Sequence, residues 1–238
     1  MIRHRPLLVA LALAALSVLA APAARADGAL TPLERRWIAA GLPVLQHARA
    51  SGLPLDIVVQ PDDEPDASPI AMAIKDERCK LVVSMRGNPR TDKLAGSIPP
   101  ALFGAVVEAV FAHEIGHCWR WSRGVWNTVP AGFVDHLDEP SSGVDPELAR
   151  AMHETRREEG YADLVGLAWT WHAHPADYAR VLGWFERVRL DEFEGEHHDT
   201  GIWLRLVHDP LVFDVRGDLF SQAEALWKRG LRASTDAP

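Results

Sequence analysis

Residues 99–121 read PPALFGAVVEAVFAHEIGHCWRW, and this stretch decides the architecture that we expect for the chain. Proline is tolerated in the first turn of a helix, so the paired prolines indicate where a helix begins. Apolar side chains then recur along the stretch, and uncharged residues surround its two histidines. This pattern is typical of a helix that is buried in the core of a domain. The sequence therefore predicts a long buried helix from about Pro99 to Trp121.

The same helix carries His113, Glu114 and His117 at a spacing that suits a metal ion. Side chains four residues apart lie on one face of a helix, so both histidines can reach a single ion. Zn²⁺ accepts imidazole ligands and lowers the pKa of a water that it binds. Glu114 can then take the proton of that water and return it to a leaving amine. The alternative is a chance match to the pattern, in a helix that holds two unligated histidines.

A third ligand is expected on the helix that follows. An aspartate that can cap the chain and a proline suited to the first helical position predict a helix over residues 145–171. Glu159 and Asp163 lie four residues apart on it, hence on one face. Glu159 can complete a His₂Glu site with an open position for water, and Asp163 can accept a hydrogen bond from a ligand histidine. The alternative is a solvated acidic face, which is our interpretation of Glu154 and Glu158.

Together the two motifs resemble those of the gluzincin metallopeptidases. HEIGH is followed 42 residues later by EGYAD, as in the group that includes the prenyl-protein endopeptidases and the membrane heat-shock proteases. The resemblance implies that His113, His117 and Glu159 bind zinc and that Glu114 is the catalytic acid and base. It also implies that Asp163 accepts a hydrogen bond from the ring of a ligand histidine, which we expect to be His113. This chain differs from those relatives because it has an export signal and no expected membrane span, so their membrane substrates are not carried over.

The resemblance has further implications for the site. Related gluzincins often carry a histidine downstream of the third-ligand helix that steadies the oxyanion, and His198 is our candidate, with His197 as its substitute. The alternative is a surface pair in a charged loop. Zincins also present an edge strand to which a substrate can add, and Lys80–Met85 is the expected strand. A bond between Cys79 and Cys118 would join this strand to the zinc helix; two buried free thiols are the alternative.

Composition and the first residues define the class of protein. The 238 residues include 25 Lys and Arg against 33 Asp and Glu, for a net charge of −8, which argues against a nucleic-acid partner and against strongly acidic substrates. A basic start, an apolar run over 7–19 and small residues before Asp27 predict a signal peptide that is cleaved after Ala26. Its loss removes three Arg and no acidic residue, leaving a mature charge of −11. No later segment is expected to span a membrane.

The mature chain, residues 27–238, is predicted to form one zincin-like α+β domain. Two short helices over 30–50 precede a small mixed sheet, whose strands we expect over 55–59, 70–74 and 79–85. The rest is mostly helical. A long loop over 122–144 separates the two motif helices and is expected to be functional. Tryptophans at its start, 119, 121 and 126, are either substrate contacts or core residues.

These expectations converge on an exported zinc metallopeptidase that acts on a protein or peptide substrate in the periplasm or outside the cell. Two alternatives remain open at this stage. One is a zinc-binding, chaperone-like or interaction protein on a zincin fold. The other is a zinc amidase that hydrolyses a non-protein amide, such as one in the cell wall.

Overall fold

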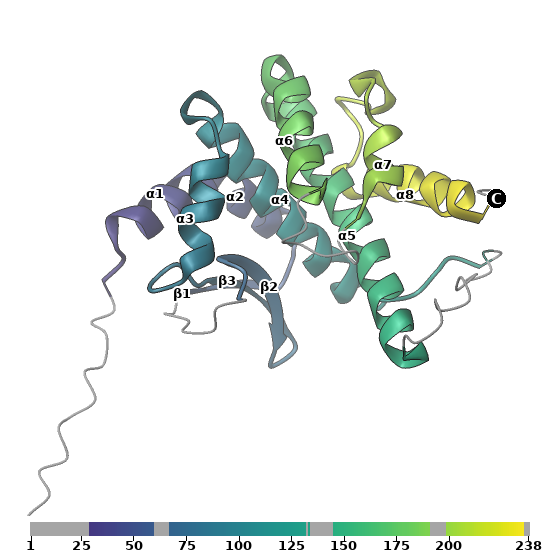
Figure 1. Cartoon of the computed structure of the whole chain (residues 1–238), viewed down its shortest axis with the longest axis horizontal. Coiled ribbons are helices and arrows are strands. Elements are labelled where there is room, and N and C mark those ends of the chain that lie inside the picture. Colours follow the sequence, from purple (N-terminus) through teal and green to yellow (C-terminus); the bar gives the residue numbers. More distant parts are fainter. Residues whose placement is uncertain (1–28, 60–66, 132, 134–144, 191–198, 236–238) are drawn as a thin grey trace, which may run out of the picture.

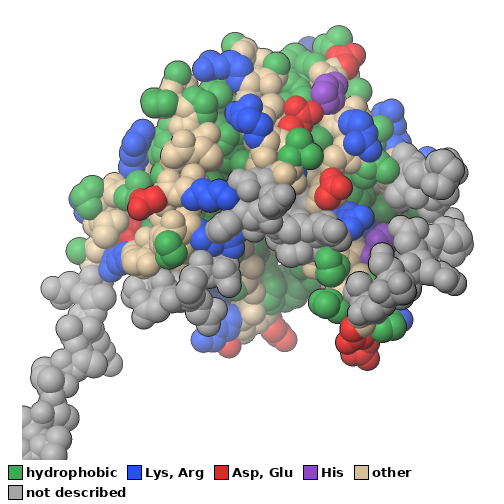
Figure 2. All heavy atoms as spheres, viewed as in Figure 1, with side chains coloured by type: hydrophobic (Ala, Val, Ile, Leu, Met, Phe, Trp, Pro, Cys, Tyr) green, Lys and Arg blue, Asp and Glu red, His purple; other side chains and the backbone are tan. Residues whose placement is uncertain are grey.

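A computed structural model of the chain describes residues 29–59, 67–131, 133, 145–190 and 199–235 (Figure 1). The expected α+β class is confirmed, since a small three-stranded mixed sheet lies against a mostly helical body. The signal segment over 1–26 and the candidate histidines His197 and His198 lie outside the described residues. On the face in Figure 2, the described Lys and Arg side chains are interspersed with Asp and Glu.

The three strands of the sheet are β1 (Leu55–Val59), β2 (Ile70–Lys75) and β3 (Arg78–Val83), in the order β1-β3-β2. β1 runs parallel to β3 and β2 runs antiparallel to it. β2 and β3 form a hairpin whose two turn residues, Asp76 and Glu77, both have positive φ, as the twist of a two-residue hairpin requires.

The prediction of the edge strand was wrong. The expected segment, Lys80–Met85, falls mostly within β3, which is the central strand because it pairs with a neighbour on each side. Its alternate residues Cys79, Leu81 and Val83 are fully buried. The β-branched residues that suggested a strand beside the site thus indicate the middle of the sheet, where both edges are covered. The edges of the sheet are β1 and β2.

Two short helices precede the sheet and a third follows it. The first begins with a capping box between Thr31 and Glu34, and Glu34 also pairs with Arg86 at 2.7 Å, which ties the helix to the segment after β3. The third helix was not predicted. Its signal is Asn88, whose side chain accepts a hydrogen bond from the backbone N–H of Arg90 and caps the helix. The three helices are α1 (Pro32–Ala40), α2 (Leu42–Ala50) and α3 (Pro89–Ser97).

The two motif helices, α4 (Phe103–Ser122) and α5 (Pro146–Ala173), cross in the middle of the molecule (Figure 1). Both agree closely with their predicted ranges. Two glycines let the helices approach each other. A Cβ atom on Gly116 would lie 3.2 Å from the Cα of Ala162, and one on Gly166 would lie 2.7 Å from the carbonyl oxygen of Ala109. The close crossing therefore depends on residues without side chains.

The remaining helices pack against α5, and one of them also contacts α4 (Figure 1). Trp203 fills the space between α5 and the last helix, Leu219–Thr235. Its ring lies where a Cβ on Gly160 of α5 or on Gly230 of the last helix would be. Its Nε1 donates to the carbonyl of Trp227, and Nε1 of Trp227 donates to the carbonyl of Arg157. These helices are α6 (Tyr178–Leu190), α7 (Gly201–Arg205) and α8 (Leu219–Thr235).

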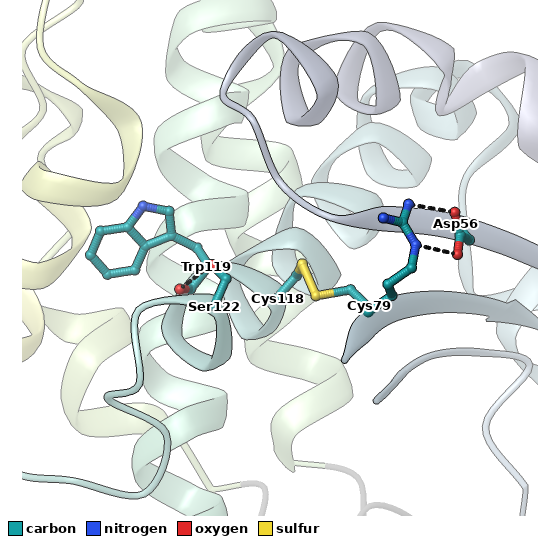
Figure 3. The surroundings of a disulfide bond; sticks show 6 residues. Asp56, Cys79, Cys118, Trp119 and Ser122 are labelled. Carbon is teal, nitrogen blue, oxygen red and sulfur yellow. Dashed lines mark hydrogen bonds and ion pairs between the residues drawn. A yellow bond between two sulfur atoms is a disulfide. The ribbon is translucent and has the colours of Figure 1, made fainter. Parts of the chain in front are cut away.

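A disulfide joins Cys79 of β3 to Cys118 of α4, with 5.7 Å between their Cα atoms (Figure 3). This pairing was predicted and is confirmed in the structure. Because β3 is central, the bond fastens the middle of the sheet to the motif helix, one residue after His117. In Figure 3 the neighbouring Trp119 points away from the sheet. Beside the disulfide, Arg78 of β3 pairs with Asp56 of β1 at 2.7 Å. The sheet and the motif helix are therefore covalently linked close to the candidate site.

One described helical segment, Pro100–Ser122, is long and apolar enough to cross a membrane by length and composition. This contradicts the expectation that no segment after the signal would meet that test. Most of the segment is buried inside the fold. Its apolar character is what a core helix requires, because it packs against α5, α2 and β2.

Candidate metal centre

α4 presents three polar side chains to one pocket, from a stretch of the helix that is flanked mainly by apolar residues. His113, Glu114 and His117 are each 7% exposed. The Nε2 atoms of the two histidines lie 3.1 Å apart, and their rings meet edge to face. Polar groups are costly to bury unless they have a partner, so this cluster calls for one.

Glu159 of α5 closes the group from the other side. Its carboxylate oxygens lie 3.3 Å from Nε2 of His113 and 3.4 Å from Nε2 of His117. A tetrahedral zinc ion with bonds of about 2.0–2.1 Å would separate its ligand atoms by about 3.3–3.4 Å. Each histidine thus lies at such a distance from one oxygen of Glu159, a different oxygen for each ring, and one ligand atom from each residue falls within 4.8 Å of the others. The structure brings together the three residues that the motifs nominated, from two helices that the glycine contacts hold close.

Asp163 lies one turn further along α5 and is fully buried. Its Oδ1 accepts a hydrogen bond from Nδ1 of His113 at 2.9 Å, which leaves Nε2 of that ring facing Glu159. Thr200 donates to Oδ2 at 2.6 Å. The nominated pair of His113 and Asp163 is therefore in direct contact, and the contact fixes the ring orientation that a metal ligand needs.

Arg189 of α6 connects Asp163 to Glu159, the third candidate ligand. Its Nη2 donates to Oδ1 of Asp163 at 2.6 Å and to Oε2 of Glu159 at 3.0 Å, and its Nε donates to Oδ2 of Asp163 at 2.9 Å. Sequence reasoning missed this residue and Thr200. A basic residue in the last turn of a helix is common and suggests only a contact with the helix dipole. Nothing local in the sequence signals a contact with α5.

The charges in this network shift the pKa values of its members. Burial alone would lower the pKa of His113, but the negative charges of Glu159 and Asp163 outweigh it and raise the pKa to about 10. Burial alone would raise the pKa of Asp163, but Arg189 and His113 lower it to about 2. Burial alone would also raise the pKa of Glu159, but His113, His117 and Arg189 hold it well below its usual range. The two carboxylates are thus ready-made anionic groups beside the histidines.

Glu114 behaves differently from the other carboxylates. Burial is the main influence on it and raises its pKa above the usual range, although His113 and His117 oppose the shift. A carboxyl group with a raised pKa takes up and releases a proton closer to neutral pH than an ordinary glutamate does. Of the acidic groups here, Glu114 is therefore the one suited to moving a proton.

A pocket of about 860 Å³ opens over these residues. β2 and α6 form much of its apolar wall, while α3 contributes Arg90 and Leu94 and the segment after α4 contributes Trp126. Trp126 is among the lining residues, whereas Trp119 is not, because its ring stacks on Tyr161 and Phe220 in the core. The apolar lining residues include Ile70, Met72, Ile74, Leu94, Val110, Trp126, Trp184, Phe185 and Val188.

The interpretation of Glu158 as a solvated residue was wrong. It is 2% exposed and accepts a hydrogen bond at 2.6 Å from Nε of Arg120, which is equally buried. The neighbouring arginines in the sequence suggested a polar face, but the partner comes from α4. Glu154 is half-buried and accepts a hydrogen bond from Asn127. Burial thus distinguishes two glutamates that look alike in the sequence.

We expect Arg189→Met to weaken zinc binding by roughly 10–100-fold, the usual effect of losing a residue that hydrogen-bonds to a metal ligand. Removing the guanidinium leaves Asp163 and Glu159 without a donor that orients both. Chelator competition at fixed pH measures the change, and the absorption spectrum of the cobalt-substituted protein reports any change in ligand geometry. Arg189→Lys should recover part of the affinity. If Arg189→Met binds zinc as tightly as the native protein, Arg189 does not position the ligands.

Comparisons of the chain with protein-family models, with curated proteins and with solved structures found no match. The likeness to gluzincins therefore rests on the motifs around His113 and Glu159 and on the geometry that brings them together.

Proposed function

We propose that the protein is a zinc-dependent metallopeptidase with a zincin-like fold. The observation that carries the proposal is the grouping of His113, His117 and Glu159, whose ligand atoms all lie within 4.8 Å of one another, with Glu114 buried beside them. A purely structural zinc ion is usually closed by four protein ligands. Among the described residues only these three His, Cys, Asp or Glu side chains form such a group, and it faces an open pocket.

In this mechanism, His113, His117 and Glu159 would hold the ion, which when bound would supply Lewis acidity and lower the pKa of a water. Glu114 accepts a proton from the attacking water through its carboxylate and then donates it to the nitrogen of the leaving amine. Its raised pKa favours both transfers near neutral pH. Asp163 holds His113 in the tautomer that keeps Nε2 available as a ligand.

β2 is the strand that suits an extended substrate. Among the described residues it pairs only with β3, so no described strand occupies its other edge. Ile70, Ala71, Met72 and Ile74 of this strand line the pocket beside the donor cluster. A peptide that adds to this edge gains backbone hydrogen bonds and presents its own carbonyl groups in a regular register. This edge replaces the one expected from the sequence.

We also propose that the protein acts in an oxidising compartment, the periplasm or the exterior. The basic and apolar start of the chain is typical of a signal peptide that is cleaved after Ala26. The disulfide between Cys79 and Cys118 supports this location, because such bonds persist mainly outside the reducing cytosol.

Digestion of an unbiased peptide library tests the proposal. The native protein is incubated with the library after zinc loading, after chelation, and after zinc is restored, and the products are identified by mass spectrometry. We expect cleavage that is lost on chelation and regained with zinc. Zinc binding without any cleavage would favour the alternative of a zinc-binding interaction protein. Cleavage that survives chelation would refute the metal mechanism.

A further inference from the structure

The segment from Arg123 to Thr128, here called the Trp126 loop, turns back over the end of α4. Backbone hydrogen bonds from Gly124 to Trp121 and from Val125 to Arg120 close the turn. Gly124 and Asn127 adopt positive φ, the left-handed conformation that Gly and Asn tolerate best. The sequence of the loop therefore suits a defined turn.

A buried ion pair fastens this loop to both motif helices. Arg120 of α4 donates to Glu158 of α5 at 2.6 Å, and also to the carbonyl groups of Val125 at 2.9 Å and Thr128 at 3.0 Å. The other oxygen of Glu158 accepts the backbone N–H of Asn127 at 3.0 Å. The pair thus contacts the loop backbone at three points.

Such a pair is costly to bury, and its desolvation is offset only when the remaining hydrogen-bonding groups find partners. Here the loop backbone supplies those partners. The guanidinium of Arg120 also lies over the ring of Trp227, 4.1 Å from its centroid, which places it firmly in the core. The arrangement gives the loop a fixed position relative to the donor cluster on α4 and α5.

The side chain held in place by this loop is Trp126. Its ring centroid lies 5.5 Å from that of the ligand candidate His117, and it lines the same pocket. It is nevertheless 41% exposed, so much of its apolar surface remains uncovered. From β2, Ile74 lines the same pocket and is 44% exposed. A rigid aromatic ring and an aliphatic side chain beside a polar centre are typical of a subsite that receives an apolar group.

We propose that Trp126 is a specificity-determining residue that contacts an apolar side chain of the bound peptide next to the metal, and that Arg120 and Glu158 position it. This inference rests on the proposed peptidase function and names its substrate class: peptides with a bulky apolar residue adjacent to the bond that is cleaved. Trp126 contacts the substrate directly, whereas Arg120 and Glu158 act through the loop.

The test measures ligand affinity rather than catalysis. Two matched peptide hydroxamates are titrated into the zinc-loaded protein by calorimetry, one with an isobutyl side chain next to the hydroxamate and one with hydrogen at that position. We expect the native protein to prefer the isobutyl compound by about tenfold or more, as apolar subsites commonly do. In Trp126→Ala the ratio of the two affinities should fall to near one, and Trp126→Phe should restore most of it.

Two further variants separate contact from positioning. Glu158→Gln keeps an acceptor for the loop but loses the charge of the ion pair, so we expect a preference between those of the native protein and Trp126→Ala. Trp121→Phe is the matched control, because Trp121 packs against the core and does not line the pocket; its ratio should equal the native one. An unchanged ratio in Glu158→Gln would overturn the positioning role.

The outcomes distinguish this inference from the proposed function. Equal affinity of the native protein for the two compounds, or a native ratio in Trp126→Ala, refutes the role of Trp126 whatever the library digestion yields. Selective binding of the isobutyl compound by a protein that cleaves no peptide refutes the peptidase proposal and supports the subsite.

Discussion

Glu114→Gln is expected to lower the kcat of peptide hydrolysis by about 10²–10⁴-fold, the usual contribution of a positioned acid and base. The amide has nearly the shape of the carboxylate but cannot accept the proton of the attacking water. Because Glu114 is not one of the three residues whose ligand atoms form the candidate metal group, zinc binding should persist. The measurement is kcat on a peptide identified in the library digestion, together with the zinc content of each variant.

The matched control for this variant is Glu108→Gln. Glu108 is also a buried glutamate of α4, but it accepts a hydrogen bond from Trp169 and does not line the pocket. The Glu108→Gln protein should hydrolyse the peptide at close to the native rate. Full activity in Glu114→Gln would show that another group moves the proton. Loss of zinc from that variant would mean that Glu114 supports the ligands rather than the reaction.

Glu159→Gln is the second change with a large expected effect, and it acts on zinc rather than on the proton. The carboxylate of Glu159 is the one anionic donor among the three grouped residues. Its replacement leaves two imidazoles and an uncharged amide to hold a divalent cation. Loss of a residue that hydrogen-bonds to a metal ligand usually lowers the affinity by roughly 10–100-fold. We expect the loss of Glu159, a ligand itself, to lower the zinc affinity by more than that. Hydrolysis should be lost in parallel at limiting zinc.

Chelator competition measures this loss, with circular dichroism as the check that the helices remain folded. Glu154→Gln is the matched control, because this glutamate lies on the same helix and outside the pocket lining, where it contacts only Asn127 among the described partners. Its zinc affinity should equal that of the native protein. Native affinity in Glu159→Gln would exclude Glu159 as a ligand and would leave a site with two histidines.

The parts of this molecule that could be predicted are those encoded locally. Asp145 and the proline after it indicated the start of α5, and the spacing of His113 and His117 placed them on one face of a helix. Contacts made by docking were not predictable in this way. Arg189 and Thr200 reach Asp163 only after α6 and α7 pack on α5, and neither helix carries a signal for that packing.

Two further features were not predicted, because their sequence patterns fit more than one structure. The helix α3 was not predicted, because Asn88 and Pro89 suit a turn as well as a helix start. Strand order was the other ambiguity, because alternation of apolar residues predicts a strand without showing which neighbours it has. The central position of β3 depends on pairings with β1 and β2, which are set by the whole domain.

The glycines at the helix crossing have a consequence for how the chain tolerates variation. The atom facing Gly166 at 2.7 Å is a backbone oxygen, which cannot rotate aside as a side chain does. Even alanine there would push α5 away from α4, and with it Glu159 from the two histidines. A Gly-to-Ala change is tolerated at many positions of a protein, but at Gly166 it would disturb the candidate metal centre. Inherited variation should therefore be as restricted at Gly166 as at a ligand.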